Sequence, residues 1–144
     1  MTALAAIRPD GWNVPLLFHV LGAMVLVGGL VTAVVFQALA SARTAFWALL
    51  FVAVPAWVLM RIGGQWIYSK EGWSGEDDPA WLGIGFLTAD LGGVLLLLTV
   101  VLAGLGVRRA GAWTSVLGRL AAGLAMVLLI AYLVAAWAMS AKPT

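Results

Sequence analysis

Four long apolar segments divide the chain, and short stretches containing charges, glycine or proline separate them. They run over about residues 12–40, 44–68, 81–107 and 113–139. About 20 helical residues cross a hydrocarbon core of about 30 Å, so each segment is long enough to span a bilayer. The pattern predicts an all-α fold. Residues 1–144 should form one transmembrane domain, an antiparallel up-and-down bundle of four helices.

Two prolines fall inside the predicted spans. Pro15 lies in the opening turn of the first span, where a missing backbone N–H costs little. Pro55 lies well inside the second span, so we expect a kink there.

The composition agrees with a lipid environment. Of the 144 residues, 64% are hydrophobic and only 10% are charged, and the mean hydropathy is +1.07, which is outside the range of soluble domains. The chain has no cysteine, which excludes thiolate catalysis, disulfide exchange and cysteine-ligated metal clusters. The formal charge of +2 comes from scattered residues without a basic patch, so we expect no nucleic-acid partner.

The positive charges indicate the orientation, because loops rich in Lys and Arg stay in the cytoplasm. Arg43 follows the first span, Arg108 and Arg109 follow the third, and Arg119 lies early in the fourth. We therefore expect a multi-pass protein of the bacterial inner membrane with both termini extracytoplasmic. The one sizeable loop, residues 69–80, is acidic and should lie on that outer side. An aromatic belt there would contain Trp12, Trp66, Trp73, Trp81 and Trp137.

Each span carries one ionisable or polar side chain at a similar depth. These residues are His19, Arg61, Asp90 and Tyr132, each about seven residues from the outer end of its span, which places them roughly 10 Å below the outer interface. Ionisable groups inside a span are costly and need a partner or a water-filled site. The sequence therefore predicts a polar cluster that comprises His19, Arg61, Gln65, Asp90 and Tyr132.

The small and polar residues fall on helical stripes, which membrane helices turn toward their neighbours. Asp90 precedes two glycines, Gly92 and Gly93, which permit close backbone approach. The stripe in the first span is Pro15, His19, Gly22, Leu26, Gly29, Ala33 and Gln37. The stripe through Arg61 holds Trp57, Gly64, Gln65 and Tyr68, and that of the fourth span holds Ala121, Ala125, Tyr132 and Ala136.

Two interpretations of the polar cluster remain open. In the first, Arg61 and Asp90 form an ion pair that fixes helix packing, and His19 and Tyr132 complete a hydrogen-bond network. In the second, the cluster lines a pocket open to the outside, where Arg61 binds an anionic or carbonyl group and His19 or Asp90 handles a proton.

The leading function hypothesis is a non-enzymatic membrane protein that binds a small or lipid-like ligand, or an accessory subunit in a homo-oligomer or larger membrane complex. A proton-linked transporter or channel is the second. It would need polar residues toward the cytoplasmic side, where only Thr32, Gln37 and Thr99 are available. A membrane enzyme acting on a quinone or lipid is the third, although no motif specifies a reaction.

No cofactor or metal is indicated. A single histidine cannot supply the bis-histidine ligation common in membrane cytochromes, and the five methionines are typical of packing rather than copper binding. The acidic run Glu76–Asp78 before Pro79 is typical of a solvated turn.

The segment FHVLGAMVLVGG, residues 18–29, has a histidine, small residues and a distal Gly-Gly. It resembles the opening helix of copper-resistance-D-like and related bacterial integral membrane proteins. Those families often carry further histidines in later helices, and this chain has none, which puts metal or haem binding in doubt. The rest of the chain, including RIGGQWIYSKEG at 61–72, looks like a small family of bacterial four-helix membrane proteins without an assigned activity, so the resemblance implies a fold only.

Overall fold

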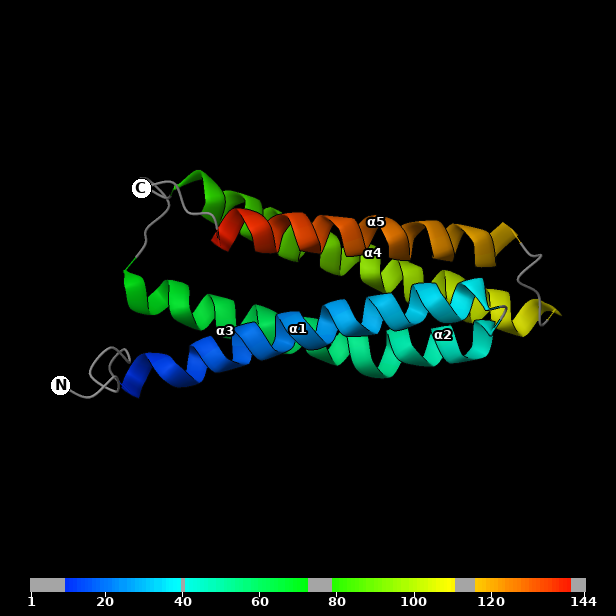
Figure 1. Ribbon diagram of the computed structural model, residues 1–144, viewed down its shortest axis with the longest axis horizontal. Helices are drawn as coiled ribbons and strands as arrows, with labels where there is room; N and C mark the ends of the chain where they lie inside the picture. Colours follow the sequence, from blue (N-terminus) through cyan, green and yellow to red (C-terminus); the bar gives the residue numbers. More distant parts are fainter. Residues whose placement is uncertain (1–9, 40, 73–78, 111–115, 141–144) are drawn as a thin grey trace.

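The computed structural model describes residues 10–39, 41–72, 79–110 and 116–140, all in helices or the turns beside them. The helices are α1 (Asp10–Ala38), α2 (Ala42–Ala48), a π-helical turn η2 (Leu49–Ala53), α3 (Val54–Glu71), α4 (Ala80–Ala110) and α5 (Val116–Ser140) (Figure 1). Since α2, η2 and α3 follow one another without a break, the described residues form four helical spans. The fold is all-α, and each span is long and apolar enough to cross a membrane.

The spans lie in two pairs, α1 beside α3 and α4 beside α5. Figure 1 shows that α1 and α4 begin, and α3 and α5 end, at the same end of the bundle, here named the α3–α4 end. The opposite end, where α1 leads into α2, is named the α2 end. The two pairs lie close together toward the α2 end and separate toward the α3–α4 end.

The stripe predicted along the first span is the buried side of α1. Pro15, Gly22, Leu26, Gly29, Ala33 and Gln37 are all buried, and His19 is partly buried. Glycine is required at Gly22 because a Cβ there would lie 2.7 Å from the Met60 Cα and 2.8 Å from the Ala56 carbonyl oxygen. Both obstacles are backbone atoms of the opposite helix, so α1 and α3 are in direct backbone contact.

One position of the stripe predicted in the fourth span is wrong. Ala121, Ala125 and Tyr132 are buried as expected, but Ala136 is exposed and Ala135 takes its place. The buried positions of α5 also include Leu128, and so recur at alternating spacings of four and three residues. This is the 3.5-residue repeat of two helices packed along their length, and it reaches position 135 rather than 136.

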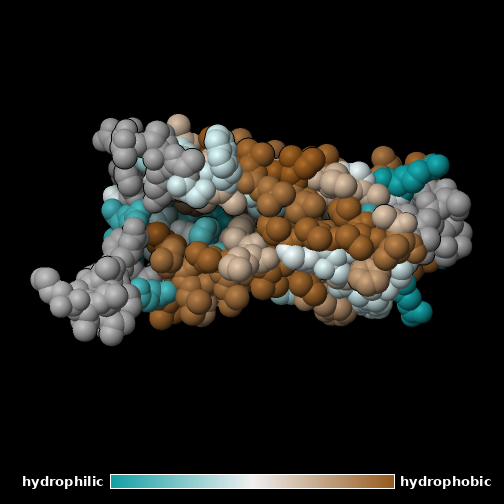
Figure 2. Space-filling model, viewed as in Figure 1, coloured by the Kyte–Doolittle hydropathy of each residue, from teal (hydrophilic) through white to brown (hydrophobic). Residues whose placement is uncertain are grey.

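Large apolar side chains lie on both the inside and the outside of the bundle. Leu26, Leu30, Leu49, Leu96 and Leu128 are at most 1% exposed and form the centre, whereas Met24, Leu87 and Trp137 are 67–69% exposed on the outside. Figure 2 shows hydrophobic residues over most of the middle of the bundle and hydrophilic ones toward its ends. Soluble monomers rarely expose so continuous an apolar surface, so lipid is the solvent that fits it.

The backbone geometry changes just before Pro55. The N–H of Val54 donates to the carbonyl of Leu49, five residues back, which makes Leu49–Ala53 a π-helical turn. Proline has no N–H and its ring clashes with the carbonyl four residues earlier. The wider turn accommodates that ring, and such turns are a recognised cause of bends. The sequence predicts a kink at Pro55, and the structure has a π-helical turn directly before that residue.

Three tryptophans of the predicted belt lie near the α3–α4 end. Trp66 and Trp137 are exposed and Trp81 is partly exposed. Trp73 and the acidic run 76–78 lie outside the described residues, as do Ala40 and Trp113 at two predicted span limits. Of Trp12 and Arg109 only the helical backbone is described.

Candidate functional site

Near the α3–α4 end, α3 and α4 meet through long side chains rather than through their backbones. The indole N–H of Trp57 donates to the Ala89 carbonyl at 2.8 Å, and the ring fills the space that the missing side chain of Gly93 leaves. The rings of Phe86 and Tyr68 meet edge to face at a centroid distance of 5.0 Å. These aromatic contacts connect the two halves of the bundle where their backbones separate.

An ion pair lies beside these aromatic rings. Arg61 Nε donates to Asp90 Oδ1 at 2.6 Å and Nη2 donates to Oδ2 at 3.4 Å, while Nη1 donates to Gln65 Oε1 at 2.9 Å. The guanidinium also lies 5.1 Å from the centre of the Phe86 ring, within cation–π range. Three of the five predicted residues, Arg61, Gln65 and Asp90, therefore form one hydrogen-bonded group.

This group is not sealed inside the bundle. The Arg61 side chain is 27% exposed and that of Asp90 is 59% exposed. Figure 2 shows hydrophilic residues within a hollow between the two halves of the bundle, toward the α3–α4 end. We call the exposed side of the group formed by Arg61, Gln65 and Asp90 the polar hollow.

His19 lies on the other side of α3 and makes a separate contact. Its Nδ1 donates to the Met60 carbonyl at 2.9 Å, and Gly64 leaves room for the ring, because a Cβ there would lie 3.0 Å from Nδ1. A proton held on Nδ1 leaves the lone pair on Nε2 in the neutral ring. His19 thus ties α1 to α3 and makes no hydrogen bond to the Arg61–Asp90 pair.

Tyr132 is also separate from the ion pair. It is 5% exposed, and its hydroxyl has no hydrogen-bond partner in the described structure. The hydroxyl faces Gly92, where a Cβ would lie 2.6 Å from the oxygen. The predicted network, in which His19 and Tyr132 complete the hydrogen bonding of the ion pair, is therefore wrong, because each ring packs against a glycine on a different helix interface.

Phe86 is the main residue of this region that sequence reasoning missed. It lies four residues before Asp90, on the same face of α4, just as Trp57 lies four residues before Arg61. In the sequence, an aromatic residue one helical turn before each charged residue could have indicated that these rings lie beside the ion pair. In the part of the chain that the structure describes, no three His, Cys, Asp or Glu side chains lie together.

No family model, curated protein or solved structure matches the chain. The site is therefore interpreted from its own chemistry. The resemblance of residues 18–29 to copper-resistance-D-like proteins stays a prediction.

Tyr132→Phe is expected to leave the free energy of unfolding unchanged within about 0.5 kcal/mol, or to raise it by up to about 1 kcal/mol. The reason is that the hydroxyl is buried without a partner, so its removal abolishes a desolvation cost and no hydrogen bond. Unfolding in mixed detergent micelles, followed by circular dichroism, measures the change. Tyr132→Ala is the control and should lose about 3 kcal/mol by leaving a cavity. A loss above about 1 kcal/mol for Tyr132→Phe would contradict the assignment and show that the hydroxyl has a partner.

Proposed function

We propose that this protein of the bacterial inner membrane binds a small or lipid-like molecule with an anionic or carbonyl group in the polar hollow. The observation that carries the proposal is the exposure of Asp90. Its carboxylate is 59% exposed although Arg61 contacts it, and it lies ten residues, roughly 15 Å, along α4 from Ala80. A charged group in contact with hydrocarbon costs about 2.5–3.5 kcal/mol at the bilayer centre. Water or a polar ligand in the hollow removes that cost.

The chemistry of the hollow fits such a ligand. A guanidinium has five N–H donors, and Arg61 uses three of them in its contacts with Asp90 and Gln65, which leaves two for a ligand. Its planar group of donors suits carboxylate, phosphate and carbonyl oxygens. The neighbouring rings of Trp57, Phe86 and Tyr68 offer an apolar surface to the body of the molecule.

The opposite half of the bundle supports a closed pocket rather than a transport path. Beyond the ion pair the centre is filled by Leu26, Leu30, Leu49 and Leu96. The Thr99 hydroxyl donates to the Leu95 carbonyl of its own helix, so it offers little to a passing ion. Enzymatic proton transfer is also less favoured, because His19 is bonded to Met60 away from the Arg61–Asp90 pair.

The proposal includes an antiparallel bundle whose α3–α4 end faces outward. Gly22 of α1 contacts Met60 and Gly29 contacts Ala53, so residue numbers rise along α1 as they fall along its neighbour. Arg43 and Arg108 lie toward the α2 end, and the positive-inside rule assigns that end to the cytoplasm.

Because the chain has no natural cysteine, single cysteines test this proposal cleanly. In intact spheroplasts, a membrane-impermeant methanethiosulfonate reagent should modify Gln65→Cys, since the hollow is wet and open to the outside. Leu91→Cys is the depth-matched control: it is 55% exposed and adjacent to Asp90, but faces lipid in the proposed arrangement and should not react. Thr44→Cys should react only after permeabilisation.

Ligand binding is tested on the same Gln65→Cys protein. We expect a short-chain quinone or a short-chain phosphatidylglycerol to slow its modification at least fivefold, and the added change Arg61→Gln to abolish that protection. If Gln65→Cys does not react even after permeabilisation, or if neither probe protects it, the ligand pocket is rejected. Modification of Thr44→Cys from the outside would instead reverse the orientation.

A further inference from the structure

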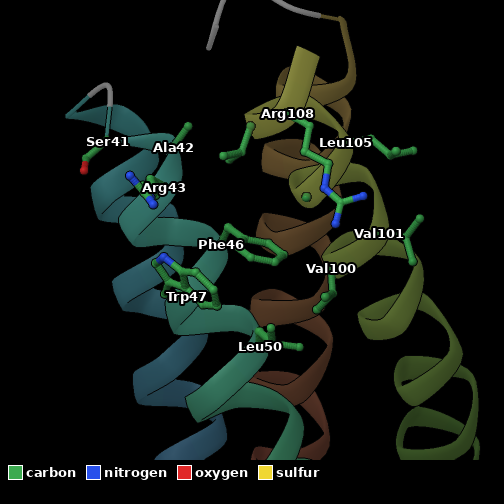
Figure 3. A pocket seen from close by; sticks show the side chains of 12 residues that line it. Ser41, Ala42, Arg43, Phe46, Trp47, Leu50, Val100, Val101, Leu105 and Arg108 are labelled. Carbon is green, nitrogen blue, oxygen red and sulfur yellow. The ribbon is translucent and has the colours of Figure 1, made fainter. Parts of the chain in front are cut away.

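A second open feature lies at the α2 end, far from the polar hollow. It is a groove of about 1080 Å³ between α2 and α4, with Arg43 on one side and Arg108 on the other. Figure 3 shows the Arg108 guanidinium above the Phe46 and Val100 side chains, in the space between the two helices. The groove is at the upper end of the size range of small-molecule sites, about 300–1,000 Å³.

The described residues that line the groove include no acidic side chain to balance its positive charge. Both arginines are exposed, and neither has a hydrogen bond or ion pair in the described structure. The groove is lined by residues between 41 and 50 and between 100 and 108, and neither stretch of the sequence contains Asp or Glu. The groove therefore offers Arg43 and Arg108 to an anion from another molecule.

The walls below the arginines are apolar. The Phe46 ring packs against Gly104, where a Cβ would lie 3.0 Å from the ring, and Val101 lines the groove from α4. Trp47, at the groove, is 42% exposed and stacks on Phe51 at a centroid distance of 5.1 Å. Tryptophan is enriched at the level of lipid headgroups. The groove therefore has cationic groups at the end of the bundle and an apolar wall below them. An anionic headgroup with hydrocarbon chains below it fits this arrangement.

We propose that the groove binds one anionic phospholipid, with its phosphate between Arg43 and Arg108 and an acyl chain along Phe46 and Val101. Basic pockets between transmembrane helices commonly hold such headgroups, and guanidinium groups pair well with phosphate. The proposal concerns a different end of the molecule from the polar hollow and does not rest on the ligand proposed there.

Native mass spectrometry of the full chain in detergent tests the proposal, with phosphatidylglycerol and phosphatidylcholine of the same acyl chains as probes. We expect at least one phosphatidylglycerol to bind and to be preferred over phosphatidylcholine. Arg43→Gln and Arg108→Gln should each weaken its binding about fivefold, the size expected for one basic residue at a lipid phosphate. Arg119→Gln is the matched control, because Arg119 is an exposed arginine of α5 that does not line the groove, and it should change binding less than twofold.

A separate variant tests whether an acyl chain lies in the groove. Val101→Trp, at a side chain already 56% exposed, fills the groove without changing its charge and should weaken phosphatidylglycerol binding as much as the loss of an arginine. Glycerol phosphate, which carries the anion without the chains, should not displace the lipid at equal concentration. Equal losses from all three arginine variants would overturn the proposal, since they would show only general surface attraction. Displacement by glycerol phosphate, or no effect of Val101→Trp, would overturn the acyl chain's place in the groove.

Discussion

Gly22→Ala is expected to lower the free energy of unfolding of the bundle by about 2 kcal/mol. The new methyl group would meet the Met60 Cα at 2.7 Å and the Ala56 carbonyl oxygen at 2.8 Å. These are backbone atoms in the middle of a helix, which cannot rotate away as a side chain can. α1 and α3 must then separate along their interface, and overpacking of this kind typically costs about 1–3 kcal/mol.

Gly28→Ala provides the matched control on the same helix. A Cβ at Gly28 has no atom within 4 Å, so the substitution should leave stability unchanged or raise it by up to about 1 kcal/mol through helix propensity. Unfolding of both variants in mixed micelles, followed by circular dichroism, gives the comparison. Equal stability of the two variants would contradict direct backbone contact between α1 and α3 at Gly22.

Breaking the Arg61–Asp90 pair should have a similarly large effect. Asp90→Asn and Arg61→Gln are each expected to lower the free energy of unfolding by about 2 kcal/mol, because each leaves one charge in the membrane layer without its partner. The double variant should lose less than the sum of the two, with a coupling of about 1–2 kcal/mol. The partial exposure of both side chains keeps these values below those of a fully buried pair.

The same unfolding assay checks the cycle, with Arg119→Gln as the control for loss of an exposed arginine. That variant should change the free energy of unfolding by less than about 0.5 kcal/mol. Strict additivity of the two single changes would mean that Arg61 and Asp90 do not stabilise each other, and the short contact between them would then have no energetic role.

The depth of the polar layer could be predicted from the sequence, but the side chains that meet within it could be predicted only in part. Arg61 and Asp90 lie at matching distances from the ends of adjacent spans, and helical rise alone brings them to one level. His19 and Tyr132 lie at that level too, yet each bonds or packs elsewhere. Their partners depend on the rotation of α1 and α5 about their axes, which the packing at Gly64 and Gly92 sets.

The incorrect prediction that Ala136 lies on the packed face of α5 also results from the rotation of that helix about its axis. Hydrophobicity does not distinguish the lipid-facing side of α5 from the packed side, because both are apolar. Only the contact with a neighbouring helix selects the 3.5-residue repeat that buries Ala135. In a soluble protein, the outer face of the helix would contact water and carry polar residues, and these would distinguish it from the packed face.

By itself, the sequence determined four helices long and apolar enough to span a membrane, because a helix satisfies its backbone hydrogen bonds within the segment, as a long apolar segment requires. It also determined the buried stripe of α1, since small residues there permit close packing. The tertiary structure decided how the helices are paired, that the Arg61–Asp90 group lies exposed where the two pairs separate, and that Arg43 and Arg108 share one groove. These features depend on the distances between the helices and on the rotation of each helix about its axis. A helix that is apolar on every side can pack in many rotations, so its sequence does not select one.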